Sequence, residues 1–596
     1  MPVLREMPLA ASLLLVGAAL FFGGGAGDGS LWWLGGVALL ALVVSAATAG
    51  VPGGWVSLVP LAALAGWLAL SIRWSSLPDR SWNYADRTLV YLLFAALGLW
   101  LAGRRRQLAL GLAVLLGAVV VWSLAGKVLP PLYDYGWPGV TRLSSPVGLW
   151  NQLAVLAAFA LPLALWRRGV SGTLLAYGWT VALVLTYSRG GVAVTVLVLV
   201  AWFALGEERI ESAATLVAAA VPAAVVAGVA FALPGVTSDF QSSATRWRDG
   251  LIFGALLLAG AGLAVILSRV PRPRDTPALR RALVAAGVLA LIAVVAVGVL
   301  KAGSFTGSDS VSNSSSRFTS GSSNFRTVWW QQALDGWQHH KLTGTGAGSF
   351  QLTNLLYRDS YLDVTTEPHN LPIQFLSEAG IVGFALFLAM CASLLRPGLR
   401  RVRTSRHDLA LALILPAFLV HSLVDVDWDF VAVAAPAFLV AGAMAGRVPL
   451  RRSSPFATLA GVGVATILFG VLLLPWLGAR WANDALGAAP KTAMRLANRA
   501  HSVDPLLVEP YWAKAYATSA TPQTAFGYYK QAVDAQPKNP ETWLQAGEFA
   551  FGLRCYQTAY TYLERYTELN NNAKPSAGAD DYRHALKLVN LGKGRC

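Results

Sequence analysis

The chain has 596 residues, of which 55% are hydrophobic and 13% are charged, and its mean hydropathy is +0.52. This composition excludes a set of soluble domains and predicts a polytopic membrane protein. The formal net charge of +16 raises the alternative of a nucleic-acid surface, so the positions of the cations have to decide between the two.

Apolar runs long enough to cross a bilayer, which takes about 17–25 residues, recur through the first 476 residues. We place about fifteen spans and predict an all-α fold, with a transmembrane domain at 1–476 and a soluble α-helical domain at 477–596. The predicted spans lie near 8–22, 30–49, 55–72, 88–102, 107–125, 147–166, 171–187, 190–205, 211–233, 250–268, 282–301, 370–395, 408–422, 429–446 and 456–476.

The cations gather in short loops between these spans. Counting from a cytoplasmic N-terminus places every basic cluster on the cytoplasmic face, as the positive-inside rule requires. The clusters are 104–106, 167–168, 269–281, 396–406 and 447–452. Membrane topology therefore explains the basic charge, and we expect no nucleic-acid partner. The outward segments are then 73–87, 126–146, 188–191, 234–249, a long loop at 302–368, 422–428 and the tail.

Arginines recur along these outward segments. Three of them stand among aromatic residues at 73–87, which is typical of an interfacial belt, with contact to a lipid-borne anion as the alternative. The Pro/Gly-rich segment 126–146 contains Arg142 and is expected to form a cavity wall. Segment 234–249 contributes Arg246 and Arg248.

The sequence LTYSRGGVAV places Arg189 at a predicted hairpin between two spans. We expect its glycines to permit the sharp reversal and a close approach of the backbone to a ligand. An arginine at the membrane boundary needs a counter-charge or an anionic ligand. Snorkelling of the side chain to the interface is the alternative.

The long loop begins with a Ser/Gly-rich stretch at 302–323 that reads as a flexible connector. The next segment, FRTVWWQQALDGWQHH, predicts an amphipathic helix at the membrane surface with Arg326 at its start. A glycine turn with Gly344, Gly346 and Gly348 follows. We expect a plain turn there, with a backbone nest for phosphate as the alternative.

Two further polar groups stand at the ends of predicted spans. In HNLP, Asn370 is expected to cap a helix, and His369 is either a functional group or a histidine held within the fold. In HSLVDVDWDF, Asp425 and Asp427 belong to an Asp-x-Asp-x-Asp run that does not fit a calcium loop. Capping a helix, or pairing with site arginines, is favoured over a metal, so no metal is predicted.

The soluble tail carries prolines at 505, 540 and 575, which recur at intervals of 35 residues. This spacing is close to the tetratricopeptide period and indicates two to three tetratricopeptide-like helical hairpins. Such repeats bind peptides or partner chains, so we expect the tail to recruit an acceptor or a protein partner.

The order and spacing of these motifs resemble those of the O-antigen ligase and O-antigen polymerase family of bacterial membrane glycosyltransferases. The resemblance covers roughly residues 80 to 446. It rests on SRGG, NFRTVWW, HKLTGTGAGSF and a His-Asn pair followed, after nine residues, by Gly380 and, two residues later, by Gly383.

Membership would imply a GT-C type fold in the bacterial inner membrane, with a cavity that faces the periplasm and a donor glycan carried on undecaprenyl diphosphate. The resemblance aligns Arg189 and Arg326 with the family's arginines and His369 with its histidine. Arginine forks suit a diphosphate, and histidine suits a general base that takes the acceptor's proton, with inversion at the anomeric carbon. We expect support from Arg142, Arg246, Arg248, Asn370, Asp425 and Asp427, and neither metal nor cofactor.

The predicted function is transfer of a glycan from this donor to a sugar, lipid or protein hydroxyl on the extracytoplasmic face. A lipid-linked glycan polymerase of the same family is the first alternative. A transporter or flippase of an anionic envelope precursor is disfavoured, because the spans carry almost no charge and show no repeated halves. A scaffold is disfavoured because one span suffices for anchorage.

Overall fold

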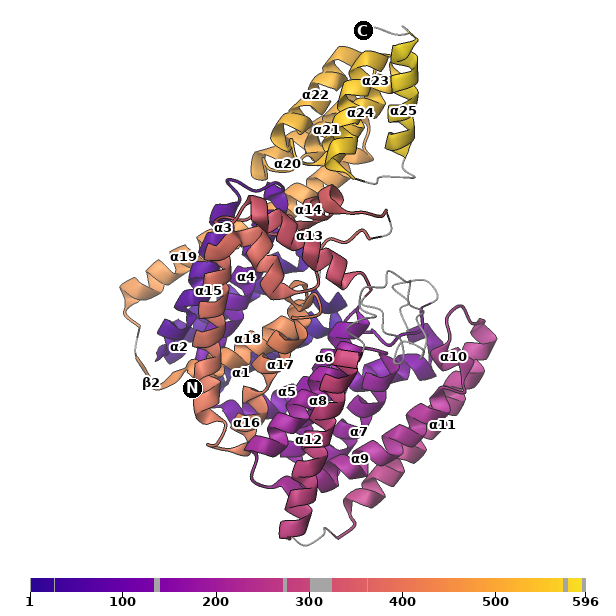
Figure 1. The fold of residues 1–596 in the computed structure, drawn as a ribbon. Coiled ribbons are helices and arrows are strands. Elements are labelled where there is room, and N and C mark those ends of the chain that lie inside the picture. Colours follow the sequence, from indigo (N-terminus) through magenta and orange to yellow (C-terminus); the bar gives the residue numbers. More distant parts are fainter. Residues whose placement is uncertain are drawn as a thin grey trace.

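The computed structural model describes residues 2–25, 27–132, 140–271, 276–300, 324–361, 363–451, 453–571 and 577–591. Within these ranges the chain is nearly all helical, and its one sheet is a two-stranded antiparallel ribbon. Figure 1 shows a broad bundle of helices from which the C-terminal helices extend at one end. The predicted all-α class is confirmed at this level.

The helices and strands follow one another with short connections. The first group is α1 Pro2–Phe21, α2 Leu31–Ala49, β1 Val51–Gly53, α3 Val59–Ser71, α4 Pro78–Leu99 and α5 Arg105–Val128. The second group is α6 Trp150–Arg167, α7 Gly169–Leu185, α8 Arg189–Leu205, α9 Arg209–Ala230, α10 Pro234–Thr237, α11 Ser243–Ser268 and α12 Pro277–Leu300.

The third group is α13 Arg326–His339, α14 Phe350–Tyr357, α15 Leu371–Arg401, α16 Arg406–Ala412, α17 Ile414–His421, α18 Val431–Ala445 and β2 Arg447–Arg451. The last group is α19 Pro455–Leu486, α20 Pro490–Val503, α21 Glu509–Ala517, α22 Pro522–Ala535, α23 Pro540–Gly552, α24 Tyr556–Leu569 and α25 Ala577–Asn590.

Six stretches in the described ranges are long and apolar enough to cross a membrane: 28–49, 105–128, 209–230, 243–268, 371–401 and 455–486. Five shorter apolar helices accompany them, so the total of fifteen spans stays a prediction. The single span predicted at 408–422 is divided at Leu413 into α16 and α17. Pro416 explains the division, because a proline lacks the N–H that would bond the carbonyl four residues earlier.

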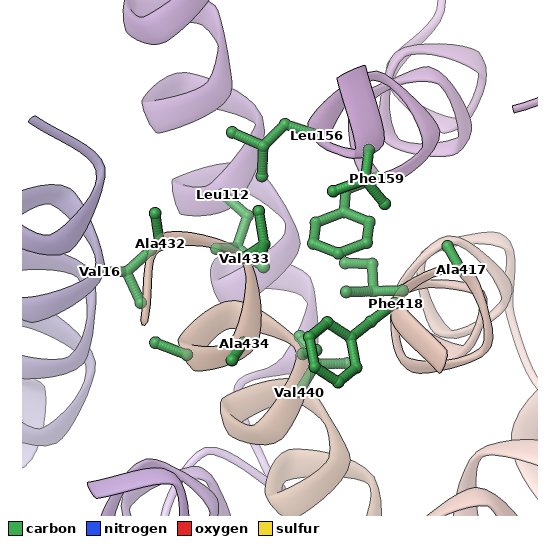
Figure 2. Packing of buried hydrophobic residues seen from close by; sticks show 14 of the residues in the cluster. Val16, Leu112, Leu156, Phe159, Ala417, Phe418, Ala432, Val433, Ala434 and Val440 are labelled. Carbon is green, nitrogen blue, oxygen red and sulfur yellow. The ribbon is translucent and has the colours of Figure 1, made fainter. Parts of the chain in front are cut away.

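The core of the bundle is built around α18, in which every residue from Val431 to Ala445 is buried. Figure 2 shows Ala432 and Val433 of this helix near Val16 of α1 and Leu112 of α5. A Cβ added at Gly442 would overlap the Ala95 carbonyl of α4, so the two backbones touch. Small residues at such contacts are how helices pack closely in membranes, where no hydrophobic effect drives them together.

The long helix α15 is interrupted at Gly380, whose φ of 67° and ψ of −170° are not helical. The glycine turn after α13 packs into this interruption: the Gly346 N–H donates to the Glu378 carbonyl at 2.8 Å. The Ile381 N–H donates in turn to the Lys341 carbonyl at 2.9 Å. Gly346 and Gly380 both have positive φ, a conformation that costs a residue with a Cβ about 1 kcal/mol or more.

Two sequence expectations about local structure are wrong. Residues 78–87 were expected in a loop that forms an interfacial belt, but they form the first turns of α4, and Arg87 is buried beside Asp28 and Asp429. The reversal before Arg189 is made by Tyr187, with a φ of 53°, and not by the glycines. Gly191 instead lies in the first turn of α8, where a Cβ would overlap Ala154 of α6.

The C-terminal helices pack successively, each against the next, on the same end of the bundle as α13 and α14 (Figure 1). The Gln536 amide donates to Asp79 at 2.8 Å, and Arg358 donates to the Asn570 side chain at 2.6 Å. The expected boundary at 476/477 falls inside the continuous helix α19, so the tail joins the bundle without a linker. The tetratricopeptide-like assignment stays a prediction.

Three expectations fall partly or wholly outside the described residues. They are the flexible connector at 302–323, the central part of the Pro/Gly-rich wall at 126–146 and the repeat proline at 575.

The contact between the tail and the bundle should loosen as pH rises. Burial raises the pKa of the Asp504 carboxyl to about 7, and the negative charges of Asp79 and Glu509 act in the same direction. A raised carboxyl pKa stabilises the folded state fully below the unfolded value of about 4 and loses that contribution as pH approaches 7. Hydrogen exchange at α20 and α21 should therefore be faster at pH 8 than at pH 5, beyond the intrinsic change.

Asp504→Asn should reduce this pH dependence, because an amide keeps the acceptor for the Leu506 N–H without a titrating proton. Asp534→Asn, at an exposed position of α22, is the matched control. An unchanged pH dependence in the Asp504 variant would contradict the assignment.

Candidate functional site

Most of the predicted site residues come together around the loop between α17 and α18, which carries Asp425. The starts of α6, α13 and α15 contribute side chains that contact this carboxylate. The start of α8 packs on the same loop, where a Cβ added at Gly190 would lie 3.3 Å from Val424. Segments far apart in the sequence therefore meet at one buried acid.

Asp425 is 3% exposed, and each of its two oxygens accepts two hydrogen bonds. Oδ2 accepts from Asn151 at 2.6 Å and from Arg326 at 3.1 Å. Oδ1 accepts from the Gln152 amide at 3.3 Å and from the Val426 N–H at 3.0 Å. This degree of pairing is what a buried carboxylate requires to remain charged.

The electrostatic surroundings keep Asp425 ionised. Burial alone would raise the pKa of its carboxyl, but His369, Arg326 and His421 hold that pKa well below its usual range. Asp425 therefore acts as a fixed negative charge at any pH near neutrality.

His369 immediately precedes the cap of α15 and has a φ of 55°, a strained value for a residue with a Cβ. Its Nδ1 lies 3.8 Å from Oδ1 of Asp425, which is an electrostatic contact rather than a hydrogen bond. Its ring stacks on Trp329 of α13, with the two centroids 4.9 Å apart. Since 22% of the side chain is exposed, the imidazole is both held in place and accessible.

Arg326 is the first residue of α13, and its guanidinium is fixed by two contacts with the Asp425 loop. Nε donates to the Val424 carbonyl at 2.7 Å, and Nη2 donates to Asp425. Arg189, at the start of α8, precedes Gly190, which packs on Val424 of the same loop. The two arginines predicted to bind a diphosphate are therefore both held at the Asp425 loop.

The supporting residues fall into two groups. Arg142 lies over the Trp150 ring at 4.1 Å and reaches Asn151 at 3.4 Å, so it is linked to Asp425 through one side chain. Asn370 caps α15 by accepting from the Ile373 N–H at 3.0 Å, and it also donates to the Leu423 carbonyl at 2.9 Å.

Arg246 and Arg248 make contacts within their own segment, 241–249. Arg246 is buried and donates to the Gln241 carbonyl at 3.1 Å, within its own segment. Arg248 pairs with the neighbouring Asp249 at 2.8 Å, and 67% of its side chain is exposed.

Asp427 forms a second, separate pair with His421. Its carboxylate lies 2.7 Å from His421 Nδ1 and accepts from the Ser422 hydroxyl at 3.2 Å. The Gln152 amide contacts both Asp425 and Asp427 and so connects the two pairs. Among the described residues, no group of three or more histidine, cysteine or acidic side chains is arranged to hold a metal.

The glycine turn is occupied by a side chain of the protein itself. The Glu378 carboxylate accepts from the N–H groups of Gly348 at 2.8 Å and Phe350 at 3.1 Å. The alternative of a backbone nest for phosphate is therefore wrong, and the turn serves to dock α13 and α14 on α15.

Three residues at the site were not predicted: Asn151, Gln152 and Trp329. The signal for the first two was present, because two adjacent amides at the start of an apolar helix are costly unless they are bonded. Trp329 gave no such signal, since one more tryptophan in an aromatic surface helix is ordinary.

Replacing the central carboxylate should destabilise the whole bundle. Asp425→Asn leaves Arg326 without its counter-charge and turns an amide N–H toward other donors, at an expected cost of about 3 kcal/mol. The thermal unfolding midpoint of the full chain in detergent should therefore fall. Asp359→Asn, at an exposed position, is the control, and equal shifts in the two variants would contradict the assigned role of Asp425.

Comparison with known proteins identifies the family of the central segment. Residues 245–388 match the family model described as O-Antigen ligase, and this segment includes Arg326 and His369. No curated protein matches the chain significantly. The match confirms, over residues 245–388, the family predicted from the sequence motifs.

Proposed function

We propose that the chain transfers a glycan from an undecaprenyl-diphosphate-linked donor to an acceptor hydroxyl on the extracytoplasmic face of the bacterial inner membrane. The family match supports a membrane glycan ligase or polymerase type of enzyme. The observation that carries the finer proposal is the convergence of Arg326 and His369 on one ionised carboxylate, Asp425.

The arginines are proposed to bind the diphosphate of the donor. When the bond between the anomeric carbon and the diphosphate breaks, negative charge develops on the leaving oxygen and must be stabilised. Guanidinium groups stay charged at any working pH and can grip phosphate oxygens bidentately. Arg326 is oriented by Val424 and Asp425, and Arg189 is held at the same loop, so the two cations can act on one diphosphate without a metal.

His369 is proposed as the general base. The acceptor hydroxyl must lose its proton as its oxygen attacks the anomeric carbon, and a neutral imidazole takes up that proton. Nδ1 faces Asp425, so Nε2 is the nitrogen directed to the acceptor, and the carboxylate stabilises the imidazolium that forms. Attack from the side opposite the diphosphate gives an inverted product.

The arrangement of charges supports the proposed orientation. The basic segments at 104–106, 396–406 and 447–451 meet around one cavity, near β2 and α16. In Figure 1 this end of the bundle is opposite to α13, α14 and the C-terminal helices. If the basic end is cytoplasmic, as the positive-inside rule requires, then the candidate site and the tail are extracytoplasmic.

Substitution at the two central residues tests the mechanism. His369→Ala or Arg326→Ala should reduce glycan transfer from a synthetic lipid-linked donor by the purified full chain by about 10²–10⁴-fold, the usual effect of losing a general base or a charge stabiliser. His340→Ala, at an exposed histidine after α13, should leave the rate unchanged. Full activity in both site variants would overturn the mechanism.

The same assay in a chelator should retain activity. Strict dependence on a divalent metal would instead point back to the carboxylates at 425–429.

Product masses separate the ligase from the polymerase. A ligase adds one donor glycan to each acceptor and gives a single product mass, which is the outcome we expect. A ladder of masses spaced by the donor glycan would identify a polymerase. Movement of the lipid-linked donor across a vesicle bilayer, with no covalent product, would favour the transporter alternative.

A further inference from the structure

A cavity of about 480 Å³ lies at the end of the bundle opposite to the candidate site. It is lined by arginines from separate segments: Arg105 and Arg106 at the start of α5, Arg401 at the end of α15, and Arg447 at the start of β2. His407 at the start of α16 completes its polar wall. Its volume is within the range of about 300–1,000 Å³ that small-ligand sites occupy.

The positive charge of this cavity is only partly compensated. Asp408 is buried and pairs with Arg105 at 2.7 Å. Arg401 Nε donates to the Met444 carbonyl, which carries no net charge. Arg106 and Arg447 are exposed and have no carboxylate partner in the described ranges.

Other arginines at this end of the bundle are differently placed. Arg168 and Arg406 share the carboxylate of Glu208, and Arg104 pairs with Glu6. These three arginines have a carboxylate beside them, unlike Arg106 and Arg447 of the cavity in the described ranges. Topological signals alone would require cations in the loops, but not their convergence around one hollow.

A narrow apolar crevice of about 20 Å³ lies beside the cavity. It is lined by residues of α15, α16, α17 and α18, among them Leu394, Leu411 and Met444. Met444 belongs to this crevice, and its carbonyl accepts from Arg401 of the cavity, so the two hollows share a wall. The crevice is too small for an acyl chain, so the charged cavity beside these apolar helices matches the anionic headgroup of a lipid rather than its chain.

We propose that this cavity binds a phosphate-bearing anion, and that its source is the headgroup of an anionic phospholipid at the membrane surface. The guanidinium groups supply forked donors for the phosphate oxygens. A bound lipid would bridge α5, α15, α16 and β2 at the face opposite to the candidate site. This binding is separate from glycan transfer, and it stands or falls independently of the proposed function.

Lipid binding by paired charge variants tests the proposal. Phosphatidylglycerol is titrated into the purified full chain in detergent, and bound lipid is counted by native mass spectrometry, with phosphatidylcholine as the uncharged comparison. Arg106→Gln with Arg447→Gln should weaken phosphatidylglycerol binding by about tenfold or more, given the contribution of each cation near a lipid phosphate. Arg400→Gln with Arg403→Gln removes the same charge from exposed positions outside the cavity lining and should change binding by less than about twofold.

The remaining outcomes are equally decisive. Equal weakening by both pairs would show a general charge effect, and no weakening by the cavity pair would show no site; either result overturns the proposal. Replacing Arg106 and Arg447 by lysine should keep most of the binding. Inorganic phosphate forms the third arm: if it binds as tightly as phosphatidylglycerol and is lost in the cavity pair, the phosphate site stands and the lipid source is overturned.

Discussion

Burying the Asp425 carboxylate carries an electrostatic cost of several kcal/mol, and the surrounding segments are arranged to offset it. The offset needs donors from α6 and a cation from α13, and the Val426 N–H completes the set. The loop, α6 and α13 are far apart in the sequence, so the carboxylate defines how these ends of the helices meet. Removing it would leave the donors and the cation facing one another without an acceptor, which is why we expect the position to be important for stability.

The second constraint is the interruption of α15 at Gly380. The glycine turn after α13 fits into this interruption and is closed by the Glu378 carboxylate. This docking holds α13 against α15, and so it places Arg326 and His369 at neighbouring helix starts. The spacing of Gly380 after His369, which forms part of the family resemblance, thus has a structural cause, because only a residue without a Cβ fits at the interruption.

Counting spans and basic loops predicted that Arg189, Arg326, His369 and Asp425 share one face of the membrane domain, and the structure brings their helix ends together at one loop. The sequence did not allow their pairing to be predicted, because pairing depends on helix packing angles that hydropathy does not encode. Asn151 and Gln152 were missed because their importance lies in a partner 273 or more residues away.

The errors have a similar origin. The start of α4 was assigned to a loop because Pro78 and several charged residues interrupt the apolar pattern, yet Arg87 is buried with acids contributed by distant segments. Local patterns report the average environment of a segment, whereas a buried ion pair is a property of two segments.

The two acids of the Asp425 loop have environments that push their protonation in opposite directions. Cations hold the pKa of Asp425 low, whereas burial raises the pKa of Asp427 against the opposing effect of His421. Such divergence assigns different roles to chemically identical groups. The charged carboxylate of Asp425 contacts Arg326 and His369 and orients both side chains. The carboxylate of Asp427 instead holds His421 and Ser422 at the end of α17. The Gln152 amide donates to both Asp425 and Asp427. Asp427, which is held by His421 and Ser422, therefore helps to fix the loop that carries Asp425.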